Sequence, residues 1–176
     1  MCESLTSIDI PNGVTSIGKY AFGATGLISI EIPYGVTKIG DYTFFNCSSL
    51  TSVKIPNSVT VIRDFAFFYC DSLMSIDIPA SVTYIGDQAF NCCSSLTSVT
   101  IPNSVTKIGD YAFANCSSLT SVYCKATTPP TGGSYMFEYS ASGRKIYVPT
   151  GSVEAYKTAD GWADYADSIV GYDFSK

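Results

Sequence analysis

Residues able to do chemistry are few in this chain. Its 176 residues include no histidine, which removes histidine-based triads, most catalytic zinc sites and the usual general base. Seven cysteines and a set of regularly spaced aspartates remain as candidates for redox chemistry or metal binding. No acid, base and nucleophile can be named together, so we expect no enzyme, no catalytic residue, no cofactor and no metal ligand.

Four of the cysteines share one spacing. They would form a ladder if the segments around them stack at the distance of adjacent strands, about 4.8 Å. In-register side chains point the same way, so a disulfide would be strained, and a ladder of buried free thiols is favoured. Cys92 is out of this register and is expected nearer to solvent, and no C-x-x-C pair suggests structural zinc. The ladder residues are Cys47, Cys70, Cys93 and Cys116.

The aspartates recur one residue after a repeated glycine, or after Arg63 in its place. Acidic loops bind calcium in some β-solenoids, and that interpretation stays open. Capping of the following turn, where an Asx side chain accepts from free backbone N–H groups, is favoured. The residues are Asp41, Asp64, Asp87 and Asp110.

These spacings belong to an internal repeat that fills most of the chain. The copies read L-T-S-[IV]-x-I-P-x-x-V-T-x-I-G-x-x-A-F-x-x-C-S-S, and spacings of 22 or 23 residues separate their first leucines. The one short spacing falls in a turn, where a stack tolerates a deletion best. The first leucines are Leu5, Leu27, Leu50, Leu73, Leu96 and Leu119.

One copy predicts a complete coil. Apolar residues alternate in 96–101, which indicates a strand that Pro102 ends. A second short strand is predicted in 105–109, where Gly109 makes a corner, and a helical or 3₁₀ turn in 110–116. A single coil cannot bury its own inner row, so successive coils must stack and share one core. The fold class is therefore a repeat solenoid of parallel β coils.

The unit I-P-x-x-V-x-x-I-G-x-x-A-F-x-x-C extends roughly from Cys2 to Cys124. It resembles the BspA-like repeats of the leucine-rich repeat class, found in bacterial and protozoan cell-surface proteins. The resemblance implies right-handed coils, a cell-surface or secreted location, and adhesion to a host or extracellular protein without catalysis. Arg63, Thr43 and Cys124 depart from the pattern without affecting the predicted fold.

The chain divides into repeats at residues 1–124 and a C-terminal cap of the same domain at residues 125–176. In the cap, Met136 and Phe137 take the place of the repeated Ala-Phe pair, and residues 144–149 form the final strand. Residues 150–169 are expected to form a helix, capped by Thr150 or Ser152 and ended near Gly161, followed by a second helical piece. These elements would shield the last coil.

The other end of the chain begins inside a coil, because the segment Cys2–Leu5 matches the tail of later copies. We therefore expect a truncated N-terminus that belongs to a longer array, and weak self-association through the exposed first coil.

Charge and hydrophobicity exclude some classes of binding partner. A net charge of -5 and a pI near 4.5 argue against nucleic acid, which needs a basic surface. No apolar run reaches the length of a membrane span, and no signal sequence is recognisable. The charged fraction of 14% is low, so serine, threonine and asparagine make a neutral, hydroxyl-rich surface.

Two columns of positions vary within the constant repeat and are the candidate binding sites. The first is the outward face of the main strand, the usual ligand surface of leucine-rich repeats. It contains Asp9, Glu31, Lys54, Asp77, Thr100 and Tyr123. The second lies beside the turn and contains Tyr20, Tyr42, Phe65 and Tyr111, with Gln88 among them.

The sheet column favours a protein ligand, and the aromatic column favours either a protein or glycan strip or a seal over the coil edge. A carbohydrate-binding accessory protein and a structural spacer therefore remain as alternative functions.

Overall fold

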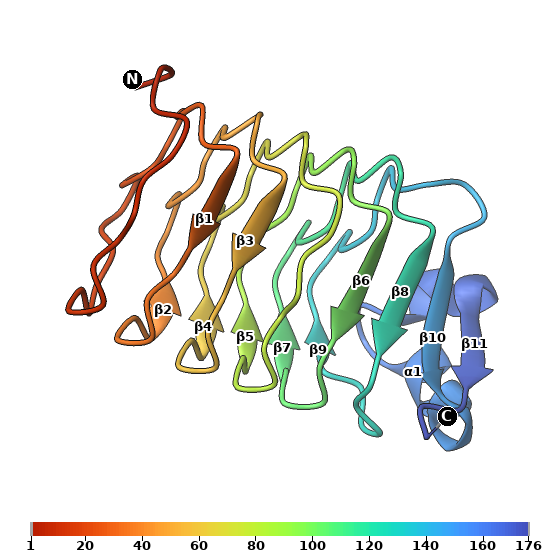
Figure 1. Cartoon of the computed structure of the whole chain (residues 1–176). Helices are drawn as coiled ribbons and strands as arrows, with labels where there is room; N and C mark the ends of the chain where they lie inside the picture. Colours follow the sequence, from red (N-terminus) through yellow and green to blue (C-terminus); the bar gives the residue numbers. More distant parts are fainter. Residues whose placement is uncertain (1, 176) are drawn as a thin grey trace.

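The computed structural model describes residues 2–175, and they form a stack of parallel coils (Figure 1). Strands of one line run down the front of the view and strands of the other run up the back. All strand pairs are parallel and join successive coils, so the predicted β solenoid is confirmed. The front strands are β1 (Ser29–Glu31), β3 (Ser52–Lys54), β6 (Ser98–Ile101), β8 (Ser121–Cys124), β10 (Lys145–Pro149) and β11 (Ile169–Tyr172).

The back strands form one continuous sheet, in the order β2-β4-β5-β7-β9. Their register advances by one coil per strand, with Ile39 opposite Ile62, Ile62 opposite Ile85, and Ile85 opposite Ile108. These isoleucines are fully buried, because alternation along each short strand turns them inward. The strands are β2 (Lys38–Ile39), β4 (Val61–Ile62), β5 (Tyr84–Ile85), β7 (Lys107–Ile108) and β9 (Thr131–Gly132).

The front line is not continuous. Strands β1 and β3 pair only with each other, whereas β6, β8, β10 and β11 form a separate sheet. The coil between them meets β6 through an isolated bridge between Asp77 and Thr100. The sheet is therefore interrupted between β3 and the segment that contains Asp77.

The shared core runs along the axis of the stack. Leu50, Leu73 and Leu96 are fully buried in one cluster, which confirms that successive copies share their interior. Phenylalanine rings form a second row, and the centroids of Phe67 and Phe90 lie 5.1 Å apart with nearly parallel planes. Each coil covers the apolar row of its neighbour, as a repeat architecture requires.

The turn side of each coil is not helical, and the prediction of a helical or 3₁₀ turn is wrong. The first and last residues of each turn have left-handed backbone angles, for example Tyr42 (φ 56°) and Asn46 (φ 56°). The N–H groups of Tyr42, Phe44 and Asn46 then donate to carbonyl oxygens of the next coil at 3.0, 2.8 and 2.7 Å. Within the turn, i→i+3 bonds such as that from the Phe45 N–H to the Tyr42 carbonyl at 3.1 Å alternate with these bonds between coils, so no continuous helix forms.

This arrangement repeats along the whole stack. The same three N–H positions donate to the following coil in every turn from Tyr20 to Asn115, so all of these bonds point toward the C-terminal end. Left-handed backbone costs a non-glycine residue roughly 1–2 kcal/mol, which the bonds between coils must offset.

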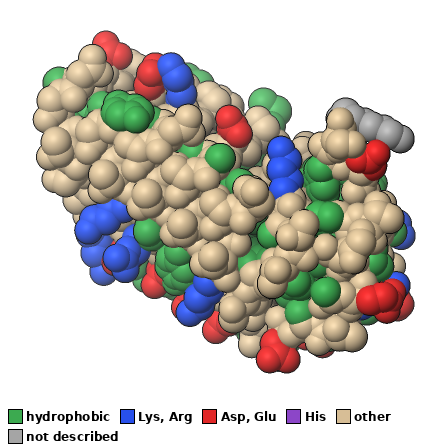
Figure 2. Space-filling model, turned by 90° about the horizontal axis from the view of Figure 1, so that it is seen from below, with side chains coloured by type: hydrophobic (Ala, Val, Ile, Leu, Met, Phe, Trp, Pro, Cys, Tyr) green, Lys and Arg blue, Asp and Glu red, His purple; other side chains and the backbone are tan. Residues whose placement is uncertain are grey.

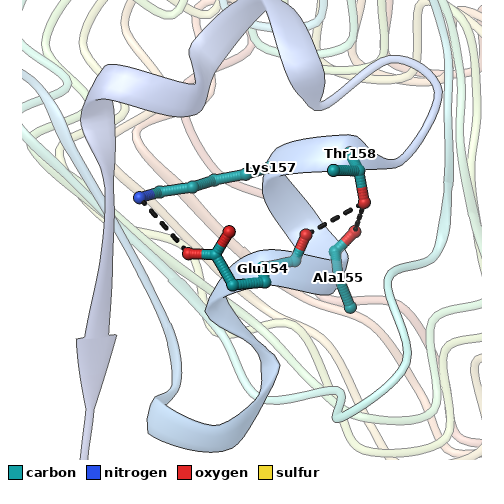
Figure 3. A network of polar contacts seen from close by, with 4 residues as sticks. All are labelled: Glu154, Ala155, Lys157 and Thr158. Carbon is teal, nitrogen blue, oxygen red and sulfur yellow. Dashed lines mark hydrogen bonds and ion pairs between the residues drawn. The ribbon is translucent and has the colours of Figure 1, made fainter.

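The C-terminal segment adds short helical elements to the last coils. They are η1 (Thr150–Ser152), α1 (Val153–Thr158) and η2 (Ala163–Ser168). In α1, Glu154 pairs with Lys157 at 3.7 Å, and the Thr158 hydroxyl donates to the Glu154 and Ala155 carbonyl groups (Figure 3). Ser152 is at the N-cap position of α1 but its side chain makes no cap hydrogen bond, so the predicted cap is wrong.

The predicted strand at residues 144–149 is present as β10, but it is not the final strand. Residues Ile169–Tyr172, where helix was expected to end, form β11 and pair with β10. Phe137 stacks on Phe113 with centroids 5.7 Å apart, and Met136 is fully buried, which confirms that they continue the repeat.

Side chains from η2 and from the loop between α1 and η2 cover the ring of Phe137. The ring centroids of Trp162 and Tyr165 lie 6.0 and 5.4 Å from it. The Trp162 indole N–H donates to the Pro130 carbonyl at 2.8 Å, and the Phe137 N–H donates to the Tyr165 hydroxyl at 3.1 Å. We propose that this segment is the cap of the same domain.

In residues 2–175, no helix has both the length and the apolar character needed to cross a membrane.

Candidate ligand-binding surface

The cysteine ladder is buried and unoxidised. Cys70, Cys93 and Cys116 are fully buried free thiols, which confirms the prediction. Each sulfur donates to a phenylalanine carbonyl of the preceding coil, as Cys93 does to Phe67 at 3.3 Å. Burial raises the pKa of Cys116 to about 12, because the thiolate would lose its hydration. These thiols hold the coils together and are not reactive groups.

The aspartates bond across coils as well. The Asp87 carboxylate accepts from the Asp110 N–H of the next coil at 3.0 Å, and the Asp64 carboxylate accepts from Asp87 N–H at the same distance. For Asp64 and Asp87, the prediction that the carboxylate caps the turn that follows it is therefore wrong about the partner, because the N–H group belongs to the next coil. Within residues 2–175, no three His, Cys, Asp or Glu side chains gather as a metal site.

The repeated glycine lies between a back strand and the turn that follows, and its backbone conformation does not demand glycine. Among the described glycines only Gly143 and Gly161 have positive φ, so Gly109 does not need left-handed backbone. A Cβ atom at Gly109 would lie 2.5 Å from the Asp87 nitrogen and 2.6 Å from the Gly86 carbonyl carbon. Glycine is required at Gly86 and Gly109 because the neighbouring coil approaches closely there, whereas the copy between Gly40 and Gly86 carries Arg63 at this position.

The sheet column lies outward on the front strands, as predicted from the alternation. The register places Glu31 beside Lys54, and Thr100 beside Tyr123. The residues between them, including Ile30 and Val53, turn inward and are buried. Neighbouring coils therefore bring the six predicted positions into one line across the strands.

Charges occupy the N-terminal half of this column. The Lys54 ammonium group contacts the Glu31 carboxylate at 2.6 Å, and both side chains are more than 60% exposed (74% and 67%). Such an exposed pair contributes about 0.2–1 kcal/mol, so Lys54 can exchange partners at little cost. Asp9 and Asp77 are also exposed and lie in the column on either side of this pair.

Two shallow depressions lie against the same residues. One, of about 400 Å³, is lined by Glu31, Lys54 and Asp77 and lies where the front sheet is interrupted. The other, of about 510 Å³, is lined by Asp9, Glu31 and Lys54 together with Ile8 and Tyr34. Side chains of a ligand could enter both, because carboxylates and apolar surface lie side by side there.

The C-terminal half of the column is aromatic. Tyr123 stacks on Tyr147 with centroids 4.7 Å apart, and Tyr172 packs edge-on against Tyr123 at 5.6 Å. Phe174 adds a fourth ring, 4.9 Å from Tyr172. We call Tyr123, Tyr147, Tyr172 and Phe174 the tyrosine cluster.

Only Tyr123 of this cluster was predicted. Tyr147 occupies the position of Tyr123 in strand β10, so alignment of K-I-Y-V-P with S-V-Y-C would have found it. Tyr172 gave no such signal, because its segment was predicted to follow a helix.

The turn-side column is a stack of rings. Tyr20 stacks on Tyr42 with centroids 4.5 Å apart, and Tyr42 stacks on Phe65 at 4.6 Å. Tyr111 stacks on Tyr135 instead, beyond the interruption at Gln88. Ring faces inside the stack are covered by their neighbours, so mainly ring edges remain for a ligand.

Much of the remaining surface is neutral. Seen from below, charged side chains lie in small separate groups among uncharged polar groups and backbone (Figure 2). Many hydroxyl groups bond between coils, as the Ser81 hydroxyl does to the Val59 carbonyl at 2.6 Å. The serine- and threonine-rich composition therefore has a structural reason.

Comparison with known proteins identifies the family. The profile of the BspA type leucine-rich repeat region, in six copies, matches residues 1–120 and 37–159. The chain belongs to the BspA-type leucine-rich repeat family. This confirms the resemblance inferred from the repeated unit. A comparison with curated proteins gives no match.

Three solved structures of leucine-rich repeat or antigen proteins are similar to this BspA-type chain. A leucine-rich repeat protein from Bacteroides ovatus is 32% identical, with a TM-score of 0.62 over 86% of this chain and 45% of that chain. The T. pallidum leucine-rich repeat protein is 27% identical, with a TM-score of 0.62 over 88% and 77%. The pneumococcal vaccine antigen PcpA is 29% identical, with a TM-score of 0.63 over 72% and 31%. The chain thus spans less than half of the Bacteroides ovatus protein.

Proposed function

We propose that this BspA-type protein acts at the cell surface or outside the cell, as a non-catalytic module that binds a host or extracellular protein through its sheet column. The observation that supports this most is the column itself. Its residues are free to vary, because they contribute nothing to the core, yet the stack aligns them on one face. Solenoids commonly use such extended faces for binding.

The proposed location rests on the family and on similarity to an antigen. PcpA, whose chain is similar over 72% of this one, is described as a pneumococcal vaccine antigen. Together with the family, this similarity supports a location at the cell surface or outside the cell as part of the proposal.

The glycan alternative has less support. Sugar rings bind aromatic side chains through exposed ring faces, and the inner rings of the turn-side column cover one another at 4.5–4.6 Å. The proposal therefore assigns this column to sealing the coil edge.

The test measures binding of the purified chain to a panel of extracellular-matrix proteins and to a glycan array. A sheet-column variant, Asp77→Asn with Tyr147→Ser, should lose protein binding at least tenfold. A turn-side variant, Tyr42→Ala with Phe65→Ala, should keep it. Glycan binding that depends on Tyr42 and Phe65 would overturn the proposal, and so would protein binding that ignores the sheet column. Circular dichroism of each variant checks that it is folded.

A further inference from the structure

The sheet column changes character along the axis of the stack. Its first four positions carry three carboxylates and one ammonium group: Asp9, Glu31, Lys54 and Asp77. From Thr100 onward it is uncharged, and it ends in the tyrosine cluster. The surface is therefore acidic at one end and aromatic at the other.

The negative charge of the acidic end is incompletely neutralised. The two ion pairs found among residues 2–175 are Lys54–Glu31 and Lys157–Glu154, so neither includes Asp9 or Asp77. The exposed carboxylates of Asp9 and Asp77 lie three coils apart, on either side of the Glu31–Lys54 pair. A positively charged partner would complete their pairing, because opposite charges steer association and fix register.

The tyrosine cluster is an independent reason to expect a ligand. Tyr172 is 41% exposed although it contacts Tyr123, Tyr147 and Phe174. Clustered tyrosines combine a large apolar area with hydroxyl groups that can bond to a partner, which is why they are enriched at protein interfaces. The hydrophobic core does not use these rings, since they lie on the outward face of β8, β10 and β11.

We infer that the ligand of this face is an extended, cationic segment of a protein that lies along the axis of the stack. Its basic side chains contact the carboxylates of the acidic end, and an aromatic side chain contacts the tyrosine cluster. This inference rests on the proposed function and adds the chemistry of the partner.

The spacing of the column sets the spacing in the ligand. Equivalent rings in neighbouring coils are 5.1 Å apart, so Asp9 and Asp77, three coils apart, are separated by roughly 15 Å along the axis. An extended chain advances about 3.4 Å per residue, and every second side chain faces the same way, so basic residues four apart match this distance. Tyr147 lies three coils beyond Asp77 and matches an aromatic residue four positions further on.

The probe is a labelled nine-residue peptide, Lys-Ser-Thr-Ser-Lys-Ser-Thr-Ser-Trp, measured by fluorescence anisotropy. A second peptide of the same composition carries its lysines three residues apart, which places them on opposite faces. A third replaces both lysines by glutamate. We expect the first peptide to bind more tightly than the second, the third not to bind, and 300 mM salt to weaken the first at least fivefold relative to 20 mM.

Matched variants locate the contacts. Asp77→Asn and Asp9→Asn should each weaken the first peptide about threefold, the size of an exposed ion pair. Asp160→Asn removes the same charge near β9, away from the front strands, and should have no effect. Tyr147→Ser should weaken the peptide about tenfold at both salt concentrations, since the ring contact is apolar.

The cationic nature of the ligand would be refuted if the glutamate peptide bound as tightly as the first peptide, or if Asp77→Asn had no effect. If Tyr147→Ser still abolished binding in that case, the proposed function would survive. If no peptide bound while a matrix protein bound through the sheet column, the extended segment would be refuted and the proposed function supported. Failure of both assays would refute both.

Discussion

The repeated glycine gives the sharpest test of how the coils pack. Replacement of Gly109 by alanine would place a Cβ atom 2.5 Å from the Asp87 nitrogen and 2.6 Å from the Gly86 carbonyl carbon, and closer still to Asp87 Oδ1. Two of these neighbours are backbone atoms, so no side-chain rotation can relieve the contact. The coils must separate locally by several tenths of an ångström.

That separation stretches two bonds between coils. The Asp110 N–H donates to the Asp87 carboxylate at 3.0 Å, and the Gly109 N–H donates to the Ile85 carbonyl at 2.8 Å. Overpacking costs about 1–3 kcal/mol, and a weakened bond to a charged group adds about 1–2 kcal/mol. We expect Gly109→Ala to lower the free energy of unfolding by roughly 3 kcal/mol.

Gly40 provides a matched control at the same position of an earlier copy. A Cβ atom there would lie 3.3 Å from the Thr43 hydroxyl and 3.4 Å from the Ile17 carbonyl oxygen, which small movements accommodate. Gly40→Ala should therefore change stability by less than about 0.5 kcal/mol, or stabilise slightly by restricting the unfolded chain.

Urea unfolding measures both variants, followed by far-ultraviolet circular dichroism and by the fluorescence of Trp162. Two probes are needed because coils of a repeat protein can unfold separately, and Trp162 reports on the C-terminal end. Similar losses for Gly109→Ala and Gly40→Ala would refute the argument that coil-to-coil distance, and not backbone conformation, selects glycine.

Three further outcomes follow from the same contacts. Asn46 is exposed with φ 56°, so Asn46→Ile should destabilise by about 1–2 kcal/mol in urea unfolding, whereas Asn46→Gly should change little. Burial raises the pKa of Cys116 to about 12, so the unfolded thiol ionises first and stability should fall as pH rises from about 9 to 12; Cys116→Ser should make that fall shallower. Trp162→Phe removes the bond to Pro130 and should lower Tm by roughly 5 °C in calorimetry.

The strands and the core could be predicted from the sequence, because each inward position recurs in every copy. Leu73, Phe90 and Ile108 lie at such positions, and all are fully buried. A position that is buried between equivalent positions of the neighbouring coils tolerates few residue types. The regular spacing of the repeat is therefore enough to identify it. The outward column was recognised by the opposite signal, because its residues differ from copy to copy while the rest of the repeat stays constant.

The turns were predicted wrongly because their composition suits a helix. Alanine and aromatic residues fill them, and aromatic side chains such as Tyr42 and Phe65 rarely adopt left-handed backbone. Hydrogen bonds to the next coil determine the backbone conformation of the turn, and the residue pattern of a single copy does not predict those bonds. Asn46 and Asn115 were the available signal, since asparagine tolerates this conformation.

The C-terminal part of the binding surface was missed for a related reason. β11 lies outside the repeat, and its pairing with β10 depends on how α1 and η2 return the chain to the front sheet. Sequence periodicity ends before that point. Tyr172 therefore reaches Tyr123 and Tyr147 through tertiary structure alone.

The hydrogen bonds on the turn side all run in one direction, so each coil presents N–H groups to the coil after it and carbonyl groups to the coil before it. The carbonyl groups of Lys19, Ala21 and Gly23 hold the positions that accept bonds in the second coil, so they would accept bonds from a coil stacked on the N-terminal side. Two first coils set against each other would oppose oxygen to oxygen along this side. Growth by stacking has a direction, and only a coil that arrives with its N–H groups foremost can extend it.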